Sequence, residues 1–149
     1  MNGNGEKIRV QTFFGYTVPA TALAAATDGT ATLRIESATD FYWFQSTYQC
    51  EVTVPAAITE STRIIPLIDV QMNVSGADRN LFQEPAPIET VFGTGLNPYV
   101  LPAPMVLLAN SEVRFEFTNR DPRALTIQLQ LLGLKDFGEL TRAAAGSEV

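Results

Sequence analysis

The sequence predicts an all-β fold, an antiparallel sandwich of the jelly-roll type with a long proline-rich excursion. Three observations predict it. Several short segments alternate apolar and polar residues, which is the period of a half-buried strand. Gly, Pro, Asn and Asp residues separate these segments at the spacing of a sandwich or barrel. No segment shows a convincing amphipathic helix, so about seven or eight short strands account for the chain.

The first half of the chain contains three predicted strands. Residues 7–14 alternate, and residues 30–36 resume the alternation after an Asp28-Gly29 turn. The alanine-rich residues 18–26 between them fit either a short helix or an irregular sheet edge. Residues 41–54 form the third strand, which ends before a proline, a residue that cannot donate a hydrogen bond to a sheet.

The third strand begins with the densest aromatic run, Phe41-Tyr42-Trp43-Phe44. Neighbouring side chains of a strand point to opposite faces, so one pair of rings should enter the core. We expect the other pair either to be sheltered by residues 75–104 or to form an exposed contact patch. Aromatic residues are enriched at protein interfaces and also stack on ligands. Packing on both faces is the favoured interpretation and a protein interface is the next.

The second half contains four further strand patterns and one long irregular segment. Residues 75–104 hold five prolines, yet they carry too many apolar residues for a disordered linker. We interpret this segment as an ordered excursion that packs on something, and we expect the partner contact there first. Gly133 either ends or bulges the last strand. The predicted strands of this half are residues 63–74, 105–108, 113–117 and 125–131, with a polar connection at 56–62 and a turn at 119–122.

At 149 residues the chain is long enough for one domain and needs no metal or disulfide for stability. We expect a single domain over residues 7–137. Residues 1–6 are polar and glycine-rich and should form a flexible tail, as should residues 138–149.

Composition excludes several classes of function. The net charge is −6, and the basic residues are scattered, so the basic stripe of a nucleic-acid-binding protein is missing. No apolar run approaches the ~18 residues that span a bilayer, and we expect no membrane contact. The first residues lack the layout of a signal peptide. The single cysteine, Cys50, cannot form an internal disulfide, which fits assembly in a reducing cytosol.

The sequence contains no histidine, which removes His-dependent catalytic groups and His-ligated zinc. We therefore predict no enzymatic activity, no metal and no cofactor. Carboxylate chemistry by Asp40, Glu51 and Asp69 ranks last among the alternatives, because it requires these acids to share a cleft. The glycine-rich residues 92–95 are followed by neither a helix nor a P-loop lysine, so we predict a structural turn rather than a phosphate site.

An ordered series of short motifs extends over residues 66–137, about half of the chain. It comprises Pro66-Leu67-Ile68-Asp69-Val70-Gln71-Met72, Arg79, Leu81-Phe82, Pro85, Pro87, Phe92-Gly93-Thr94-Gly95, Pro98-Tyr99-Val100-Leu101-Pro102, the strand around Phe115, and Leu131-Leu132-Gly133-Leu134-Lys135-Asp136-Phe137. This order resembles a family of small virion proteins from tailed bacteriophages. In the first half, only Asp40-Phe41-Tyr42-Trp43 matches.

The resemblance implies a jelly-roll capsid cement or decoration protein of the virion head, assembled in the host cytoplasm. Its implied partners are the major capsid protein and further copies of itself, as a dimer or trimer, with no catalytic residue and no small-molecule substrate. Two alternatives stay open. One is another virion component, such as a tail, baseplate or head-fibre protein. The other is a carbohydrate-binding sandwich that uses Tyr42, Trp43 and Tyr48. The candidate interface residues are Tyr42, Phe44, Arg79, Leu81, Phe82, Phe92 and Tyr99.

Overall fold

The computed structural model describes residues 6–53, 66–75 and 79–142, and the structural statements below concern these residues. The predicted connection at 56–62 lies outside the described residues, as do residues 1–5 of the tail predicted at 1–6 and residues 143–149 of the tail predicted at 138–149. Glu6 and residues 138–142 belong to strands, so that part of the tail predictions is wrong.

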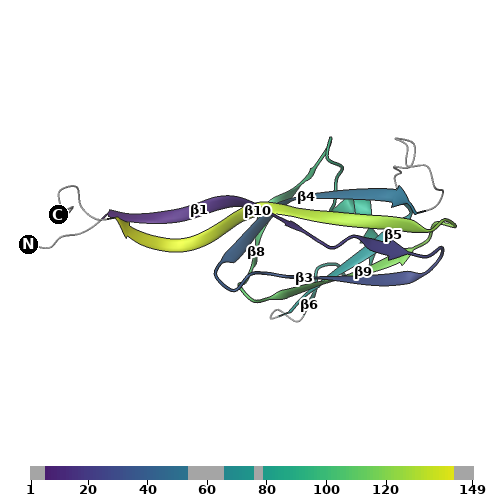
Figure 1. Cartoon of the computed structure of the whole chain (residues 1–149), viewed down its shortest axis with the longest axis horizontal. Coiled ribbons are helices and arrows are strands. Elements are labelled where there is room, and N and C mark those ends of the chain that lie inside the picture. The colour runs from purple at the N-terminus through teal and green to yellow at the C-terminus, as the bar shows by residue number, and fades with distance from the viewer. Residues whose placement is uncertain (1–5, 54–65, 76–78, 143–149) are drawn as a thin grey trace, which may run out of the picture.

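Two antiparallel sheets pack face to face as a sandwich (Figure 1). Sheet A has the strand order β1-β10-β4-β8, with β2 paired to β10, and sheet B has the order β3-β9-β5-β6, with β7 paired to β5. The strands of sheet A are β1 (Glu6–Thr17), β2 (Thr21–Leu23), β4 (Asp40–Val52), β8 (Tyr99–Leu107) and β10 (Leu125–Arg142). Those of sheet B are β3 (Asp28–Arg34), β5 (Ile68–Val74), β6 (Arg79–Asn80), β7 (Ala86–Pro87) and β9 (Glu112–Asn119).

The connections follow the jelly-roll pattern. The chain crosses between the sheets six times, from β2 to β3, from β3 to β4, from β4 to β5, from β7 to β8, from β8 to β9 and from β9 to β10. Such crossings place strands from both halves of the sequence side by side, as in two interlocked Greek keys. The predicted fold class is confirmed. The ambiguous residues 18–26 contain only the short strand β2, which fits the irregular-edge interpretation.

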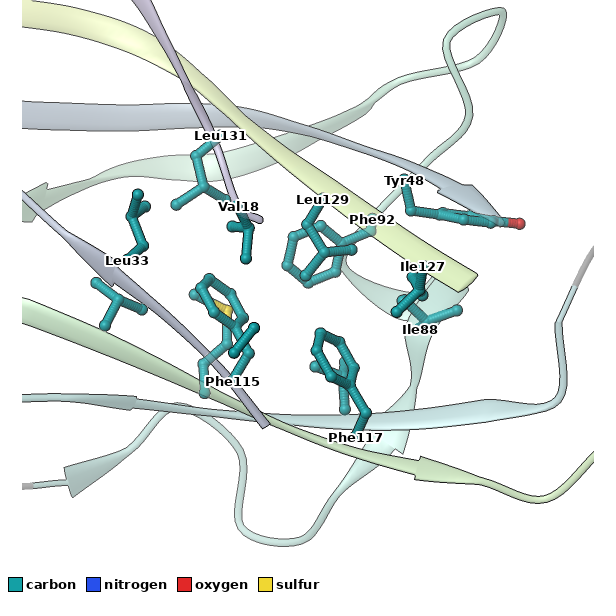
Figure 2. Close-up of a cluster of buried hydrophobic side chains, with 14 of the residues drawn as sticks. Val18, Leu33, Tyr48, Ile88, Phe92, Phe115, Phe117, Ile127, Leu129 and Leu131 are labelled. Carbon is teal, nitrogen blue, oxygen red and sulfur yellow. The ribbon is translucent and has the colours of Figure 1, made fainter. Parts of the chain in front are cut away.

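Alternating side chains of both sheets fill the space between them (Figure 2). On β10 the predicted apolar face is confirmed, because Leu125, Ile127, Leu129 and Leu131 are all buried. Apolar burial of this kind contributes roughly 25 cal/mol per Å² and is the main favourable term for folding.

The alternation separates the aromatic run into two pairs, and the prediction that one pair enters the core is confirmed. Phe41 and Trp43 are buried, whereas Tyr42 and Phe44 are half-buried. Phe44 is the additional residue of a β-bulge, because the pairing of β4 with β10 shifts between Trp43 and Gln45. The bulge reverses the phase of the strand, so that even-numbered residues such as Ser46 face the core after it.

Gly133 lies opposite this bulge on β10, but β10 neither ends at Gly133 nor carries an extra residue there, so the prediction of an end or a bulge at this position is wrong. A Cβ atom at position 133 would lie 1.9 Å from the carbonyl oxygen of Tyr42, so only glycine permits this close approach of the strands. The strand then continues to Arg142, beyond the domain boundary at 137 that the sequence indicates. Beyond Asp136 it pairs with β1 alone, and the two strands project from the sandwich as a ribbon (Figure 1).

The proline-rich excursion is shorter than predicted. β8 starts at Tyr99 rather than at 105, because an edge strand tolerates Pro102 and Pro104. Its pairing with β4 jumps from Met105 to Val100, which lets the intervening residues bulge out. The remainder contains the single-turn 3₁₀ helix η2 (Ile88–Thr90) and packs largely on the domain's own core.

Candidate binding surface

One row of apolar side chains crosses the outer face of sheet A from edge to edge. The strand registers place Phe13 opposite Leu134, Leu134 opposite Tyr42, and Tyr42 opposite Val106. Directly opposed residues of antiparallel strands share one face of the sheet. The neighbours Phe41 and Leu107 face the core and are fully buried, so this row points outward. We call Phe13, Leu134, Tyr42 and Val106 the outer row.

The outer row exposes large apolar surface. Phe13 is 63% exposed and Val106 is 43% exposed, and Val100 beside them on β8 is 63% exposed. Single exposed apolar residues are ordinary, but a contiguous apolar patch indicates an interaction surface. The face is not uniform, because its other half carries the polar residues Thr47, Gln49, Gln128 and Gln130. The apolar half is therefore a distinct surface with a polar border.

A charged cluster borders the row at the side of the ribbon. Arg9 Nε donates a hydrogen bond of 3.0 Å to Asp136 Oδ2, and Arg9 Nη2 donates one of 3.0 Å to the hydroxyl of Tyr42 and also pairs with Asp136. The hydrogen bond from Arg9 lowers the pKa of Asp136 below its ordinary value, and the same contact raises the pKa of Arg9. This cluster fixes the Tyr42 ring, so the centre of the outer row is held in one orientation.

On the core-facing side of sheet A, behind the outer row, Lys135 covers the end of the core. Lys135 is 8% exposed, its Nζ lies 3.5 Å from the centroid of the Phe14 ring, and it pairs with Glu36. The ammonium group stacks on an aromatic face and reaches a carboxylate that is open to solvent. Lys135 therefore seals this end of the core without leaving an unpaired buried charge.

The candidate interface residues do not form one surface. Tyr42 lies on the outer side of β4 and Phe44 is the half-buried extra residue of the bulge, whereas Leu81 and Phe82 follow β6 and pack partly on the core. The backbone of Phe82 is held by Gln71, whose Nε2 donates to its carbonyl at 2.9 Å. The side chain of Arg79 lies outside the described residues, and Tyr99 opposes Ser46 on the core-facing side of β8.

Phe92 requires a correction, because it is a core residue. It has no exposed surface and stacks on Trp43 with ring centroids 6.4 Å apart, and Phe115 meets it edge-on. A partner cannot reach it in this fold. Phe13, Leu134, Val100 and Val106 were absent from the predicted set. The sequence does contain one signal for them, since residues 131–134 are apolar on the solvent side of β10 as well as on the core side.

The carboxylates considered for catalysis are far apart. Asp40 and Glu51 stand at opposite ends of β4, which at about 3.3 Å per residue separates them by more than 30 Å. Asp69 lies in the other sheet and pairs with Arg120 at 2.9 Å. The three acids do not share a cleft. No group of three or more potential metal ligands gathers in the described ranges.

The glycine-rich residues 92–95 form the predicted turn. Asn97 N donates to Thr94 O at 3.1 Å, and a Cβ atom at Gly93 would clash with the backbone of Asn97. Gly95 borders a shallow cavity of about 120 Å³ with Tyr48 at its side. Trp43 and Tyr48 are 1% and 7% exposed, so the aromatic residues considered for carbohydrate binding do not form a surface platform.

Comparison of the chain with protein-family models, with curated proteins and with solved structures yields no match in any of the three. None of the helices in the part of the chain that the structure describes has the length and apolar character to cross a membrane. The class that the fold itself defines is an all-β jelly-roll sandwich.

Proposed function

We propose that this chain is a non-enzymatic structural protein of a tailed-phage virion, a capsid cement or decoration protein that binds and stabilises major capsid subunits. The outer row is the observation that carries the proposal, because it offers an apolar, partly aromatic surface that a single copy leaves in water. The motif order over residues 66–137 supports the virion as the setting.

The contact is expected to be a broad, flat one. The outer row lies on a sheet face rather than in a deep cavity, and its bordering charges Arg9 and Asp136 already neutralise each other. A flat apolar centre with a polar border is the usual anatomy of a protein–protein interface. The proline-containing bulge of β8 lies beside the row, and proline-rich segments lose little conformational entropy when they dock.

A head-binding assay tests the proposal. Phage heads that lack this protein would be mixed with the purified chain, and bound protein would be measured after sedimentation of the heads. The variant Val100→Ser/Val106→Ser removes apolar surface from the exposed edge of the row. Each valine is about half exposed, so docking gains roughly 1 kcal/mol from each, and the pair should weaken binding about thirtyfold.

Leu67→Ser is the control, because this leucine is 57% exposed and directly precedes β5 of the other sheet. It should bind heads like the native chain. Failure of the native chain to bind heads, or its presence in tails alone, would refute a role in the head. Equal weakening by both variants would refute the assignment to the outer row.

A further inference from the structure

The sheet edges of this protein are protected unequally. Edge strands present unpaired N–H and C=O groups, and proteins usually protect them with proline, charge or short length. β8 carries two prolines, and β6 and β7 have two residues each. β3 is seven residues long and bears charges at both ends. Residues 10–18 of the β1 edge contain neither proline nor charge, and no described strand pairs with that side of β1.

The free backbone groups of this edge can be assigned from one hydrogen bond. Val18 N donates to Leu129 O at 2.9 Å, so position 18 bonds toward β10. Bonding direction alternates along an antiparallel strand, and therefore the even-numbered residues bond to β10. The N–H and C=O groups of Gln11, Phe13, Gly15 and Thr17 point away from the sheet, and all four residues are exposed.

We propose that β1 pairs antiparallel with β1 of a second copy of this chain, around a two-fold axis at Phe14. The four residues with free groups are symmetric about this position, so position 11 of one copy meets position 17 of the other, and 13 meets 15. Every free N–H and C=O of the set then has a partner. A register shifted by one residue toward either end would leave groups of this set unpaired.

The side chains fit the same register. Phe13 of one copy lies across from Gly15 of the other, and an aromatic ring over a cross-strand glycine is a favourable pair. The Leu132 side chain already lies beside Gly15, with its Cδ2 2.9 Å from where a Cβ atom would be, so the ring meets an apolar neighbour. No like charges oppose each other, because residues 10–18 are uncharged.

This pairing produces a dimer and no larger assembly. Each chain has one such edge, and a two-fold operation uses both copies of it, so the assembly ends at a dimer. The axis is perpendicular to the joined sheets, and both outer rows therefore face the same side. The dimer does not depend on the proposed function, because it forms between isolated chains.

Sedimentation velocity of the full chain tests the dimer. The native protein should sediment as two 16.2 kDa chains at micromolar concentration. In Gln11→Lys/Thr17→Lys, lysine opposes lysine at both symmetric contacts, and the dimer should weaken about tenfold or more. Gln11→Glu/Thr17→Lys opposes unlike charges at the same contacts and should restore the dimer.

Thr30→Lys/Thr32→Lys places two lysines on the exposed side of β3 and is the control, which should remain a dimer. Circular dichroism checks that every variant is folded. A monomeric native chain, including one that pairs only with another protein, would overturn the proposal. So would a dimer that Gln11→Lys/Thr17→Lys does not weaken, or one that the charge-reversed variant fails to restore. Head binding by the monomeric variant would leave the proposed function standing while the dimer is tested separately.

Discussion

Replacing Gly133 with alanine should lower the free energy of unfolding by about 3 kcal/mol. The added Cβ atom would lie 1.9 Å from the carbonyl oxygen of Tyr42, whereas real Cβ contacts essentially never fall below 3.0 Å. The obstacle is backbone, so no side-chain rotation relieves it. β10 must move away from β4 at the bulge, which adds the loss of inter-strand hydrogen bonds to the cost of overpacking.

Urea unfolding followed by tryptophan fluorescence measures this effect, since Trp43 lies in the β4 segment paired with Gly133. With an m-value of about 2 kcal/mol/M, the midpoint should fall by about 1.5 M. Gly95→Ala is the control, because its Cβ atom meets nothing within 4 Å, and it should range from no change to a gain of about 1 kcal/mol.

The variant Gly133→Ala/Phe41→Leu separates the two contacts at this position. The Phe41 ring is the second neighbour of the new Cβ atom, at 2.9 Å, and leucine removes it. The double variant should be no more stable than Gly133→Ala, because the Tyr42 carbonyl remains. A Gly133→Ala midpoint within about 0.3 M of the native one would refute the reasoning, as would full rescue by Phe41→Leu.

Two further predictions concern titratable groups. Burial raises the pKa of the Cys50 thiol to about 12, so a thiol reagent at pH 8 should modify Cys50 only in urea-unfolded protein. Rapid modification of the folded protein would contradict the burial of this thiol. Hydrogen bonds from Arg123 hold the pKa of Asp121 below its ordinary value, so the stability from this carboxylate is complete above about pH 4 and is lost as the pH falls through the lowered value. Asp121→Asn should therefore flatten the fall of unfolding free energy between pH 4 and pH 2, and an unchanged slope would show that Asp121 does not contribute to it.

The fold class could be predicted because alternation is a local signal that burial imposes on each strand. It separated Phe41 and Trp43 from Tyr42 and Phe44, although it did not indicate which pair is the buried one, and it marked the buried face of β10. The turn at 119–122 could also be predicted, because it depends on neighbouring residues: Asn119 Oδ1 accepts a hydrogen bond from Asp121 N at 2.9 Å. Such features need no information about distant parts of the chain.

The parts that could not be predicted depend on contacts across the sequence. The outer row forms because three strand registers align β1, β10, β4 and β8, and no local sequence pattern predicts these registers. Phe92 follows an irregular segment, and only its packing on Trp43 reveals it as core. The sequence indicates an end of the domain at residue 137, whereas pairing with β1 carries β10 past Gly138, whose φ of 78° is unusual for a strand.

The position of β10 in the middle of sheet A has a consequence for the order of folding. β10 pairs with β1, β2 and β4, and it follows all three in the chain. During synthesis these strands emerge before the strand that joins them, so until residues 125–142 leave the ribosome β1 and β2 have no partner strand and β4 has only β8. Pairing between distant segments is slow, on the order of milliseconds to seconds, and the incomplete chain is open to aggregation in that interval. We expect a chain truncated before residue 125 to be insoluble, although it would contain nine of the ten described strands.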